Sequence, residues 1–286
     1  MPSGVTTSAT GPSVSFVMPV HNQCAYTQQC LDGLRQDGVQ DEDIVVIDNA
    51  SNDETPKFLD SRSSLRVLSN PTNLGVSVAW NQGVDTALAG GADWIVVINN
   101  DVVIPTGFRD ALVGFATRNR CEIVSPAMGE GELDYDLPAF AAEFVAKMSG
   151  SARLGVASGV CFMVQRSVFE RVGLFDEKCG LAGYEDEDFF RRARGAGFHL
   201  AITGAAYLHH YGSITQKSIK AALGNTQKSR LGDREYFRRK HGLHNAKRIA
   251  EELALSVRLA TWKRHERRLS GFTLRMLRTN EAWELR

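Results

Sequence analysis

The chain has 286 residues, of which 43% are hydrophobic, and its 33 Lys and Arg residues are matched by 33 Asp and Glu residues. This composition can bury a full core, which excludes a largely disordered protein. The five cysteines are odd in number and form no C-x-x-C pair, which argues against a disulfide framework or a zinc site. Because the sequence has no long apolar run and no signal-peptide pattern, we expect a cytoplasmic protein with a disordered N-terminus over residues 1–13.

The first hundred residues alternate between strand-like and helix-like segments. Residues 13–20 are rich in β-branched side chains, and residues 24–36 place apolar side chains at helical spacing. The same alternation continues in strands over 43–51, 65–70 and 93–99 and in helices over 53–61 and 75–88. It predicts an α/β fold with a mostly parallel central sheet and helices on both faces.

Two of the predicted buried strands end on polar residues. VVIDNAS places Asp48 at the end of one strand, and VVINND places Asn99, Asn100 and Asp101 at the end of another. Ligands of open α/β sheets bind outside the carboxyl ends of the strands, so we expect these residues to face one crevice. No G-x-G-x-x-G or P-loop is present, whereas carboxylates and amides suit a nucleotide with Mg²⁺ or Mn²⁺.

Six blocks of the sequence resemble glycosyltransferase family 2, whose members are inverting enzymes of the GT-A fold. They cover roughly residues 14–213 and read FVMPVHNQ, VVIDNASNDET, NPTNLGVSVAWNQG, WIVVINNDV, ASGVCFMVQRSVFERVGLFDE and GYEDEDFFRRARGAGF. The Q-x-x-R-W signature of processive polymerases is missing, and FFRRARGAGF stands in that region. The resemblance is therefore to non-processive, bacterial polysaccharide or rhamnosyl-type transferases.

The resemblance implies a catalytic GT-A domain over residues 14–216, with a Rossmann-like nucleotide-binding half over 14–101 and an acceptor and catalytic half over 102–216. Residues 217–286 are expected to form a basic, mainly helical C-terminal extension. The segment 129–150 interrupts the pattern, and its length suits an acceptor-binding insertion or a mobile lid.

Donor binding is implied for residues at the strand ends. These residues are Pro19, Val20, Asn22, Asp48, Asp53, Asn73, Asn99 and Asn100, with Gly159 close to the donor sugar. The residues alone leave other roles open, because Asp53 also fits a helix N-cap, Asn73 a turn and Gly159 an ordinary strand glycine. Asp48 differs, since an acid that closes a buried strand needs a partner.

The implied metal site departs from the family's D-x-D motif, because Asn99 replaces its first acid. Asp101 is the expected direct ligand of Mn²⁺ or Mg²⁺, and the ion should depend on the donor's diphosphate for further ligands. His209 is the implied histidine ligand, with its neighbour His210 as the alternative.

The implied catalytic base lies among four consecutive acids that precede a helix. Asp186 occupies the family's position for the base and Glu185 stands beside it, while Glu185 and Asp188 remain alternatives. The base would take a proton from an acceptor hydroxyl as that oxygen attacks the anomeric carbon of the sugar. A single displacement of this kind inverts the anomeric configuration.

Charge is divided unevenly along the chain. Residues 1–216 hold 15 Lys and Arg against 26 Asp and Glu, a net charge of −11, whereas residues 217–286 hold 18 against 7, a net charge of +11. In the segment 248–283, Ile249, Leu253, Leu255, Leu259 and Trp262 are predicted to share a helical face with basic residues further round. The basic extension is expected to pack on the body or on a second copy in a homodimer, or to contact donor phosphates or an anionic membrane. Nucleic acid is disfavoured, because aromatic residues are not interleaved along the basic run.

The sequence thus predicts transfer of a sugar from a UDP- or dTDP-sugar to a hydroxyl of a glycan or polyprenyl-linked saccharide acceptor. The enzyme would be cytoplasmic and peripheral on the inner face of the membrane. A nucleotidyltransferase is the alternative enzyme, but it predicts a basic, glycine-rich loop where PVHNQCAYTQQ stands. A non-catalytic nucleotide-sugar-binding module is the alternative outside enzymes.

Overall fold

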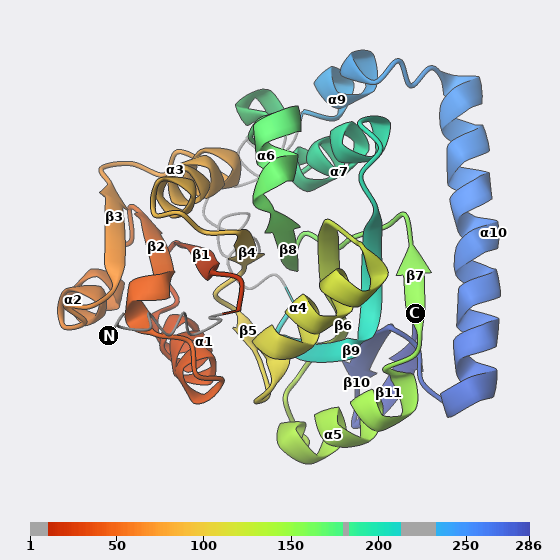
Figure 1. Ribbon diagram of the computed structural model, residues 1–286, viewed down its shortest axis with the longest axis horizontal. Helices are drawn as coiled ribbons and strands as arrows, with labels where there is room; N and C mark the ends of the chain where they lie inside the picture. The colour runs from red at the N-terminus through yellow and green to blue at the C-terminus, as the bar shows by residue number, and fades with distance from the viewer. Residues whose placement is uncertain (1–10, 180–182, 213–232) are drawn as a thin grey trace, which may run out of the picture.

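The structure is a computed structural model that describes residues 11–179, 183–212 and 233–286 (Figure 1). Its first half forms the predicted alternation of strands and helices. The elements are β1 (Val14–Val20), α1 (Cys24–Gln36), the 3-10 helix η1 (Asp41–Asp43), β2 (Ile44–Asn49), α2 (Thr55–Asp60), β3 (Arg66–Asn70), α3 (Val76–Ala89) and β4 (Trp94–Ile98). Strands β1, β2, β3 and β4 pair in parallel, as expected for the nucleotide-binding half.

The start of the described chain is bound to the body, although residues 1–13 were predicted to be disordered. Residues 1–10 lie outside the described residues, but Ser13 is tied to the body by Asp93, whose Oδ2 accepts from both the N and the Oγ of Ser13 at 2.9 Å. The serine thereby anchors the start of β1 beside the start of β4.

The second half of the chain is a mixed sheet. It contains β5 (Val102–Val103), α4 (Phe108–Asn119), β6 (Ile123–Gly131), α5 (Leu137–Met148), β7 (Ala152–Leu154), β8 (Cys161–Gln165), α6 (Arg166–Val172), η2 (Glu177–Cys179), α7 (Glu185–Gly195) and β9 (Leu200–His210). Strand β8 runs antiparallel between β4 and β6, and β9 pairs in parallel with β6 and antiparallel with β5 and β7. The predicted α/β fold is confirmed, and the second half combines parallel pairs of β6 with antiparallel pairs of β8.

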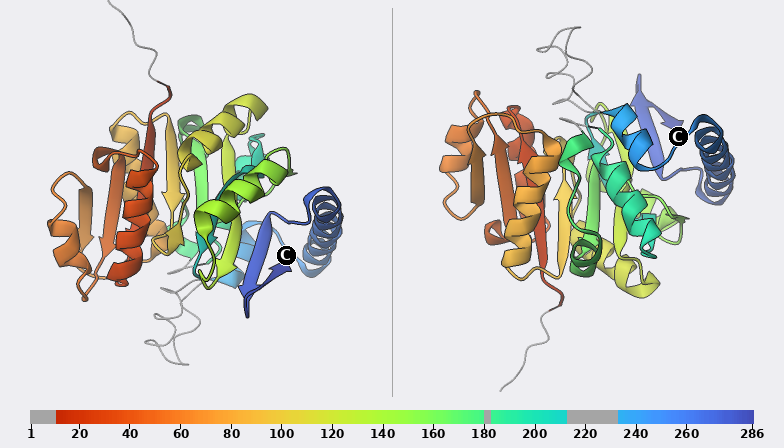
Figure 2. Two further views of the ribbon diagram at one scale, coloured as in Figure 1. Left: turned by 90° about the horizontal axis from the view of Figure 1, so that it is seen from below. Right: turned by 90° about the horizontal axis from the view of Figure 1, so that it is seen from above.

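Alternate side chains of the strands enter two cores on opposite faces of the sheet. Phe16 and Met18 of β1 face the core covered by α1 and α4, while Val17 faces the core covered by α3, α6 and α7. Figure 2 shows these two sets of helices on the two faces. Because the helices occupy both faces, the carboxyl edge of the sheet is the region where polar residues can gather.

The segment 129–150 is a packed part of the fold. It comprises the end of β6 and the helix α5, whose Phe144 and Met148 are fully buried against β9 and the C-terminal strands. Phe140, Phe144 and Met148 are spaced four residues apart, which puts them on one side of the helix. This burial does not fit the expectation of a mobile lid.

The C-terminal extension returns to the central sheet, which the sequence did not predict. Residues 217–232 are outside the described residues; α9 (Arg234–Lys240) and α10 (Asn245–Ser270) are followed by β10 (Arg275–Thr279) and β11 (Ala282–Leu285). Strand β10 pairs in parallel with β6, and β11 pairs with β10 at the end of the sheet. The extension is therefore joined to the catalytic half, and the expected boundary at residue 216 does not separate two structural units.

The apolar residues of α10 were predicted to share one face of the helix, but in the structure some are turned toward the body and others are exposed to solvent. Leu259 and Trp262 are half-buried toward the body, whereas Ile249, Leu253 and Leu255 are exposed. Nine residues correspond to about two and a half helical turns, so Leu253 and Trp262 point in opposite directions.

A buried ion pair fixes α10 to the body. The Arg153 guanidinium of β7 donates to both carboxylate oxygens of Glu266, at 2.8 and 2.7 Å, and both side chains are almost completely buried. Glu266 also accepts from Leu274 N at 3.1 Å, just before β10 begins. One carboxylate thus joins α10 to β7 and to the chain entering β10.

Replacing Glu266 by alanine should lower the free energy of unfolding by about 3–5 kcal/mol, because Arg153 would be left charged and buried without its partner. Urea unfolding followed by circular dichroism measures this change. The control is Glu252→Ala, which removes an exposed pair with Arg248 and should cost no more than about 1 kcal/mol. Equal losses in the two variants would show that the buried pair is not a structural anchor.

Candidate active site

The loops that follow β1 and β2 are bonded to each other at the carboxyl edge of the sheet. Asn22 donates its backbone N–H to Ser51 Oγ at 2.7 Å, and its side-chain oxygen accepts from Asn52 N at 2.7 Å. Asn22, Gln23 and Ala50 have positive φ angles, a conformation that is uncommon outside glycine and that often occurs at functional sites. The predicted donor-binding residue Asn22 therefore shapes this part of the edge.

The parallel pairing of β1 with β2 sets Val20 opposite Asp48 at the ends of the two strands. Pro19 is the preceding residue of β1. The Val20 side chain is buried in the core beneath α1, so only its backbone can face a ligand. Pro19 is half-buried. Asp48 is 5% exposed, and its Oδ1 accepts from Ser51 N at 2.9 Å, which supplies the partner that its position required.

Asp53 and Asn73 are engaged by the protein backbone. The carboxylate of Asp53 accepts from Thr55 N at 2.9 Å and from Cys24 N at 3.2 Å, which joins the starts of α1 and α2. Asn73 accepts from Gly75 N at 3.0 Å in the turn before α3. These contacts match the capping and turn roles that the sequence left open beside donor binding.

Asn49 is a residue of this edge that sequence reasoning missed. Its amide nitrogen donates to Asn73 Oδ1 at 2.9 Å, and its oxygen accepts from Asn70 Nδ2 at 3.1 Å and from Leu74 N at 2.9 Å. This nearly buried side chain thus holds the loop between β3 and α3. Its signal in the sequence was a second polar residue directly after Asp48.

The three polar residues at the end of β4 have different surroundings. Asn99 is held by its backbone N–H, which donates to Val160 O at 2.9 Å. Asn100 is buried and donates its amide to Thr27 Oγ1 of α1 at 2.9 Å. Asp101 is 3% exposed, and its Oδ1 lies 3.3 Å from the Nε2 of His210. Of the three, Asp101 therefore has the side chain best placed to ligate a metal.

His209 does not fit the role of metal ligand that the resemblance implied. Its Nδ1 lies 2.9 Å from the Tyr135 hydroxyl and its Nε2 lies 3.0 Å from Gly131 O, so both ring nitrogens are used within the protein. Burial lowers the pKa of His209 to about 4, which keeps the ring neutral in this network. Successive side chains of a strand point to opposite sides, and the side chain of β9 that meets Asp101 is that of His210.

The donor set at Asp101 and His210 fits a hard or borderline divalent cation. Two ligands about 2.1 Å from one ion and at right angles to each other are about 3.0 Å apart, close to the observed separation of these atoms. A carboxylate oxygen, a neutral imidazole nitrogen and phosphate oxygens of a donor suit Mn²⁺ and Mg²⁺. These two residues could hold the ion.

Asp186 and Gly159 are in direct contact. A Cβ atom added at Gly159 would lie 2.1 Å from Asp186 Oδ2, so only glycine leaves room for this carboxylate. The neighbouring Val160 bonds to Asn99, which connects the carboxylate to the end of β4. The sequence predicted that Gly159 lies near the donor sugar. The structure provides another explanation for a glycine at this position, because any side chain would collide with Asp186.

Glu185 and Asp186 form an acidic pair at the first turn of α7, in which Glu185 is buried and Asp186 is half-buried. Burial, and then the adjacent charge of Asp186, raises the pKa of Glu185 to about 7. Burial also raises the pKa of Asp186. Acids with a raised pKa in a cleft are candidates for proton transfer near neutral pH.

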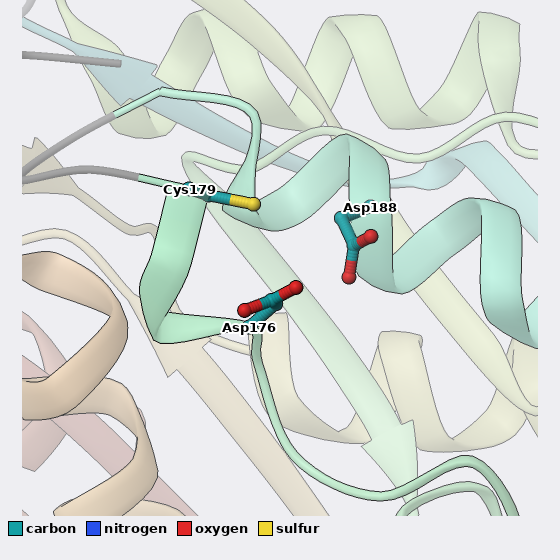
Figure 3. Close-up of side chains that lie close together, drawn as sticks. All are labelled: Asp176, Cys179 and Asp188. Carbon is teal, nitrogen blue, oxygen red and sulfur yellow. The ribbon is translucent and has the colours of Figure 1, made fainter. Parts of the chain in front are cut away.

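Asp176, Cys179 and Asp188 gather behind α7, with ligand atoms within 4.8 Å of one another (Figure 3). The carboxylates are already neutralised, because Lys240 lies 2.5 Å from Asp176 Oδ2 and 2.6 Å from Asp188 Oδ1. Arg192 donates to the other oxygen of Asp188 at 2.8 Å. Burial would raise the pKa of Asp188, but these cations hold it below its ordinary value. The cluster is therefore an ion-pair network and not a metal site, and it excludes Asp188 as the free base.

This network attaches α9 to the start of α7. Besides the contacts of Lys240, the Tyr236 hydroxyl donates to Asp176 at 2.6 Å, and the Phe237 ring stacks on Tyr184 at 5.0 Å between centroids. Tyr184 has a φ of 74° and immediately precedes the acidic pair. The C-terminal extension thereby fixes the position of the residues expected to supply the base.

A pocket of about 570 Å³ opens at the same edge of the sheet, beyond Asp101. Its wall combines Tyr26 and Tyr211, whose rings meet edge to face, with the loop 131–134 and the turn 278–280 between β10 and β11. The backbone N–H of Tyr211 donates to Asp101 O at 3.0 Å, so the pocket adjoins the candidate metal ligand. Aromatic, carboxylate and amide groups in one concave surface suit a polar ligand with apolar faces.

A parallel first half joined to a mixed second half, with an acid after β4 and acids at the start of α7, is the arrangement expected of a GT-A glycosyltransferase fold. The model of the family described as Glycosyl transferase family 2 matches residues 15–173, which is more than half of the chain. The chain belongs to this family, and it is a glycosyltransferase.

Similar proteins include glycosyltransferases whose names or bound ligands refer to different sugars. N-acetylglucosaminyl-diphospho-decaprenol L-rhamnosyltransferase of Mycobacterium tuberculosis is 29% identical over 222 residues, or 65% of this chain and 72% of that protein. GalNAc-T7, solved with UDP, GalNAc and Mn²⁺, matches at a TM-score of 0.58 and 16% identity, over 86% of this chain and 57% of its own. The mannosyltransferase PcManGT of Pyrobaculum calidifontis, solved with GDP-Man and Mn²⁺, matches at a TM-score of 0.52 and 18% identity, over 71% and 58%. The chain spans less than two thirds of these solved chains, and because their sequence identities to it are only 16% and 18%, they establish the fold alone.

Gly159→Ala should lower turnover by about 10²-fold, because the added methyl group would displace the Asp186 carboxylate from its position. Initial rates of sugar transfer or donor hydrolysis measure the loss. The matched control is Gly150→Ala, where an added Cβ would meet no atom within 4 Å. Full activity of the Gly159 variant would show that the close approach is not needed for catalysis.

Glu185 should contribute a fall in the free energy of unfolding between about pH 4.5 and pH 7, and Glu185→Gln should remove this contribution. With a pKa of about 7 in the folded state against an ordinary 4.5, Glu185 keeps its proton on folding over that interval, so stability decreases as the pH rises. Urea unfolding at several pH values measures the slope. An unchanged slope in the variant would mean that Glu185 is not the buried acid responsible.

Proposed function

We propose that the protein is an inverting, metal-dependent glycosyltransferase that moves a sugar from a nucleoside-diphosphate sugar to a hydroxyl of an acceptor glycan. The proposal rests mainly on the contact between the Asp186 carboxylate and Gly159. The next residue, Val160, bonds to Asn99 at the end of β4, two residues before Asp101. This arrangement brings an acid able to accept a proton near a pair of residues able to hold a metal ion. A UDP- or dTDP-sugar is the proposed donor.

Asp186 is the proposed base, with Glu185 supporting it. Burial makes the ionised form of Asp186 more basic than an exposed aspartate, so it can take the proton of the attacking hydroxyl more completely. Glu185 has a raised pKa beside it, and sharing one proton between the two acids would limit repulsion when Asp186 is charged. Attack from the side of Asp186 in a single displacement yields an inverted product.

Asp101 and His210 are the proposed holders of Mn²⁺ or Mg²⁺. A bound divalent ion supplies positive charge that stabilises the departing nucleoside diphosphate. Asn99 and Asp48 are the proposed contacts of the ribose and the base, since they follow or end the two strands β4 and β2 that pair in parallel with β1 on either side of it. Pro19, Asn22 and the loop held by Asn49 complete the donor site.

The pocket between Tyr26, Tyr211 and the turn 278–280 is the proposed seat of the acceptor's saccharide. It lies on the side of Asp101 that faces β6 and β10, away from the strands that carry the proposed nucleotide contacts. A polyprenyl-linked saccharide is the proposed acceptor, because the similar mycobacterial rhamnosyltransferase is named for a diphospho-decaprenol substrate. No helix of the described ranges is long and apolar enough to span a bilayer. Because the proposed acceptor is lipid-linked, we propose that the enzyme works in the cytoplasm, peripheral on the inner face of the membrane.

Asp186→Asn should bind UDP or dTDP with Mn²⁺ as the unaltered protein does, yet lose turnover by about 10²–10⁴-fold, because an amide cannot accept the proton. His210→Ala should instead weaken the Mn²⁺-dependent binding of the nucleotide. Calorimetry and initial rates separate the two effects, with Glu170→Gln, an exposed acid on α6, as the control.

Product analysis tests the reaction class in the same samples. Release of a nucleoside diphosphate with an inverted glycoside supports the proposal. Release of pyrophosphate would indicate a nucleotidyltransferase, and binding without turnover over a panel of donor sugars would indicate a non-catalytic module.

A further inference from the structure

Most contacts between helix α10 and the described part of the body lie along one side of the helix; near its C-terminal end Arg267 also donates to Leu285 O. Glu266 bonds to Arg153 in the interior, Arg258 donates to Leu154 O, and Glu251 pairs with Arg191 of α7. Trp262 lies on this inner side and is half-buried. Figure 2 shows α10 beside the edge of the sheet formed by β10 and β11, at the opposite end of the molecule from α2 and β3.

The opposite side of α10 presents an exposed apolar stripe. Ile249, Leu253 and Val257 follow one another at intervals of four residues, and they are 55%, 64% and 59% exposed. Four residues advance slightly more than one turn, so the three side chains form a continuous row. Ala246, Ala250 and Ala260 lie beside this row and are exposed as well.

Basic side chains continue the same side of the helix. Arg264 and Arg268 follow the apolar row toward the C-terminal end of α10, and both are exposed. They belong to residues 233–286, which hold 14 Lys and Arg against 7 Asp and Glu, a net charge of +7, whereas residues 1–216 carry −11. An anionic surface would therefore attract the side of the molecule that bears α10 and repel the body.

We propose that this outer face, formed by Ile249, Leu253, Val257, Arg264 and Arg268, docks on the anionic surface of a lipid bilayer. The apolar row would enter the boundary between headgroups and acyl chains, and the arginines would contact lipid phosphates. A helix of 26 residues is about 39 Å long and can lie in the membrane plane. The choice of a bilayer over another partner rests on the proposed function, because a lipid-linked acceptor requires the enzyme to work at a membrane surface.

Docking is tested by sedimenting the full chain with vesicles of phosphatidylglycerol and phosphatidylcholine, and with vesicles of phosphatidylcholine alone. Leu253→Glu changes the centre of the apolar row. Leu269→Glu is the matched control, because Leu269 is 63% exposed on the same helix but lies on the other side. Both substitutions change the net charge equally, so a difference between them reports the position and not the charge.

The proposal predicts salt-sensitive binding to the anionic vesicles, reduced about tenfold or more by Leu253→Glu and about twofold or less by Leu269→Glu. Equal binding of the two variants, or equal binding to neutral and anionic vesicles, would overturn it. A dimer of the unaltered protein in lipid-free sedimentation analysis that Leu253→Glu dissociates would also overturn it, since a second copy would then cover this face.

Donor hydrolysis in lipid-free solution separates this proposal from the proposed function. Both variants should hydrolyse the donor at the unaltered rate, because neither residue lies at the candidate active site. Hydrolysis without vesicle binding would reject docking alone, whereas vesicle binding without any turnover by the unaltered protein would reject the enzymatic proposal alone.

Discussion

The site depends on one short strand pairing, in which β9 ends antiparallel to β5. The pairing sets Val102 opposite His210, and the next backbone bond runs from Tyr211 N to Asp101 O at 3.0 Å. As a result, an imidazole from residue 210 meets a carboxylate from residue 101 in a buried environment. The same pairing places Tyr211 at the entrance of the neighbouring pocket, so it joins the proposed metal and acceptor sites.

The C-terminal extension supports this site from two directions. Its strands β10 and β11 complete the sheet beside β6, and the turn between them forms one wall of the pocket. Its helix α9 fixes the start of α7 through Lys240, which pairs with Asp176 and Asp188. Because Asp188 is held in this network, the neighbouring acids Glu185 and Asp186 are the remaining candidates for the base. The extension thus supports the residues of the proposed active site.

The sequence predicted those features that depend on local pattern. The parallel strands of the first half, the acid after β4 and the acidic start of α7 were all visible as apolar runs followed by polar residues. Strand register was not visible, and the choice of His210 over His209 depends on it. Residues 275–285 were read as the end of a helical extension because their pairing with β6 is a long-range contact. The sequence pattern also predicted a single apolar face for α10. Which side of that helix is covered depends on its long-range packing against the body, which the pattern does not reveal.

The central claim is that Asp101 and His210 together hold the metal ion of the donor site. The most direct test is anomalous diffraction at the manganese edge from crystals of the protein grown with Mn²⁺ and UDP or dTDP. The account predicts a peak bonded to Asp101 Oδ1 and His210 Nε2, with His209 still bonded to Tyr135. A peak at His209 or among Asp176, Cys179 and Asp188, or no peak at the Asp101–His210 pair with nucleotide bound, would contradict it.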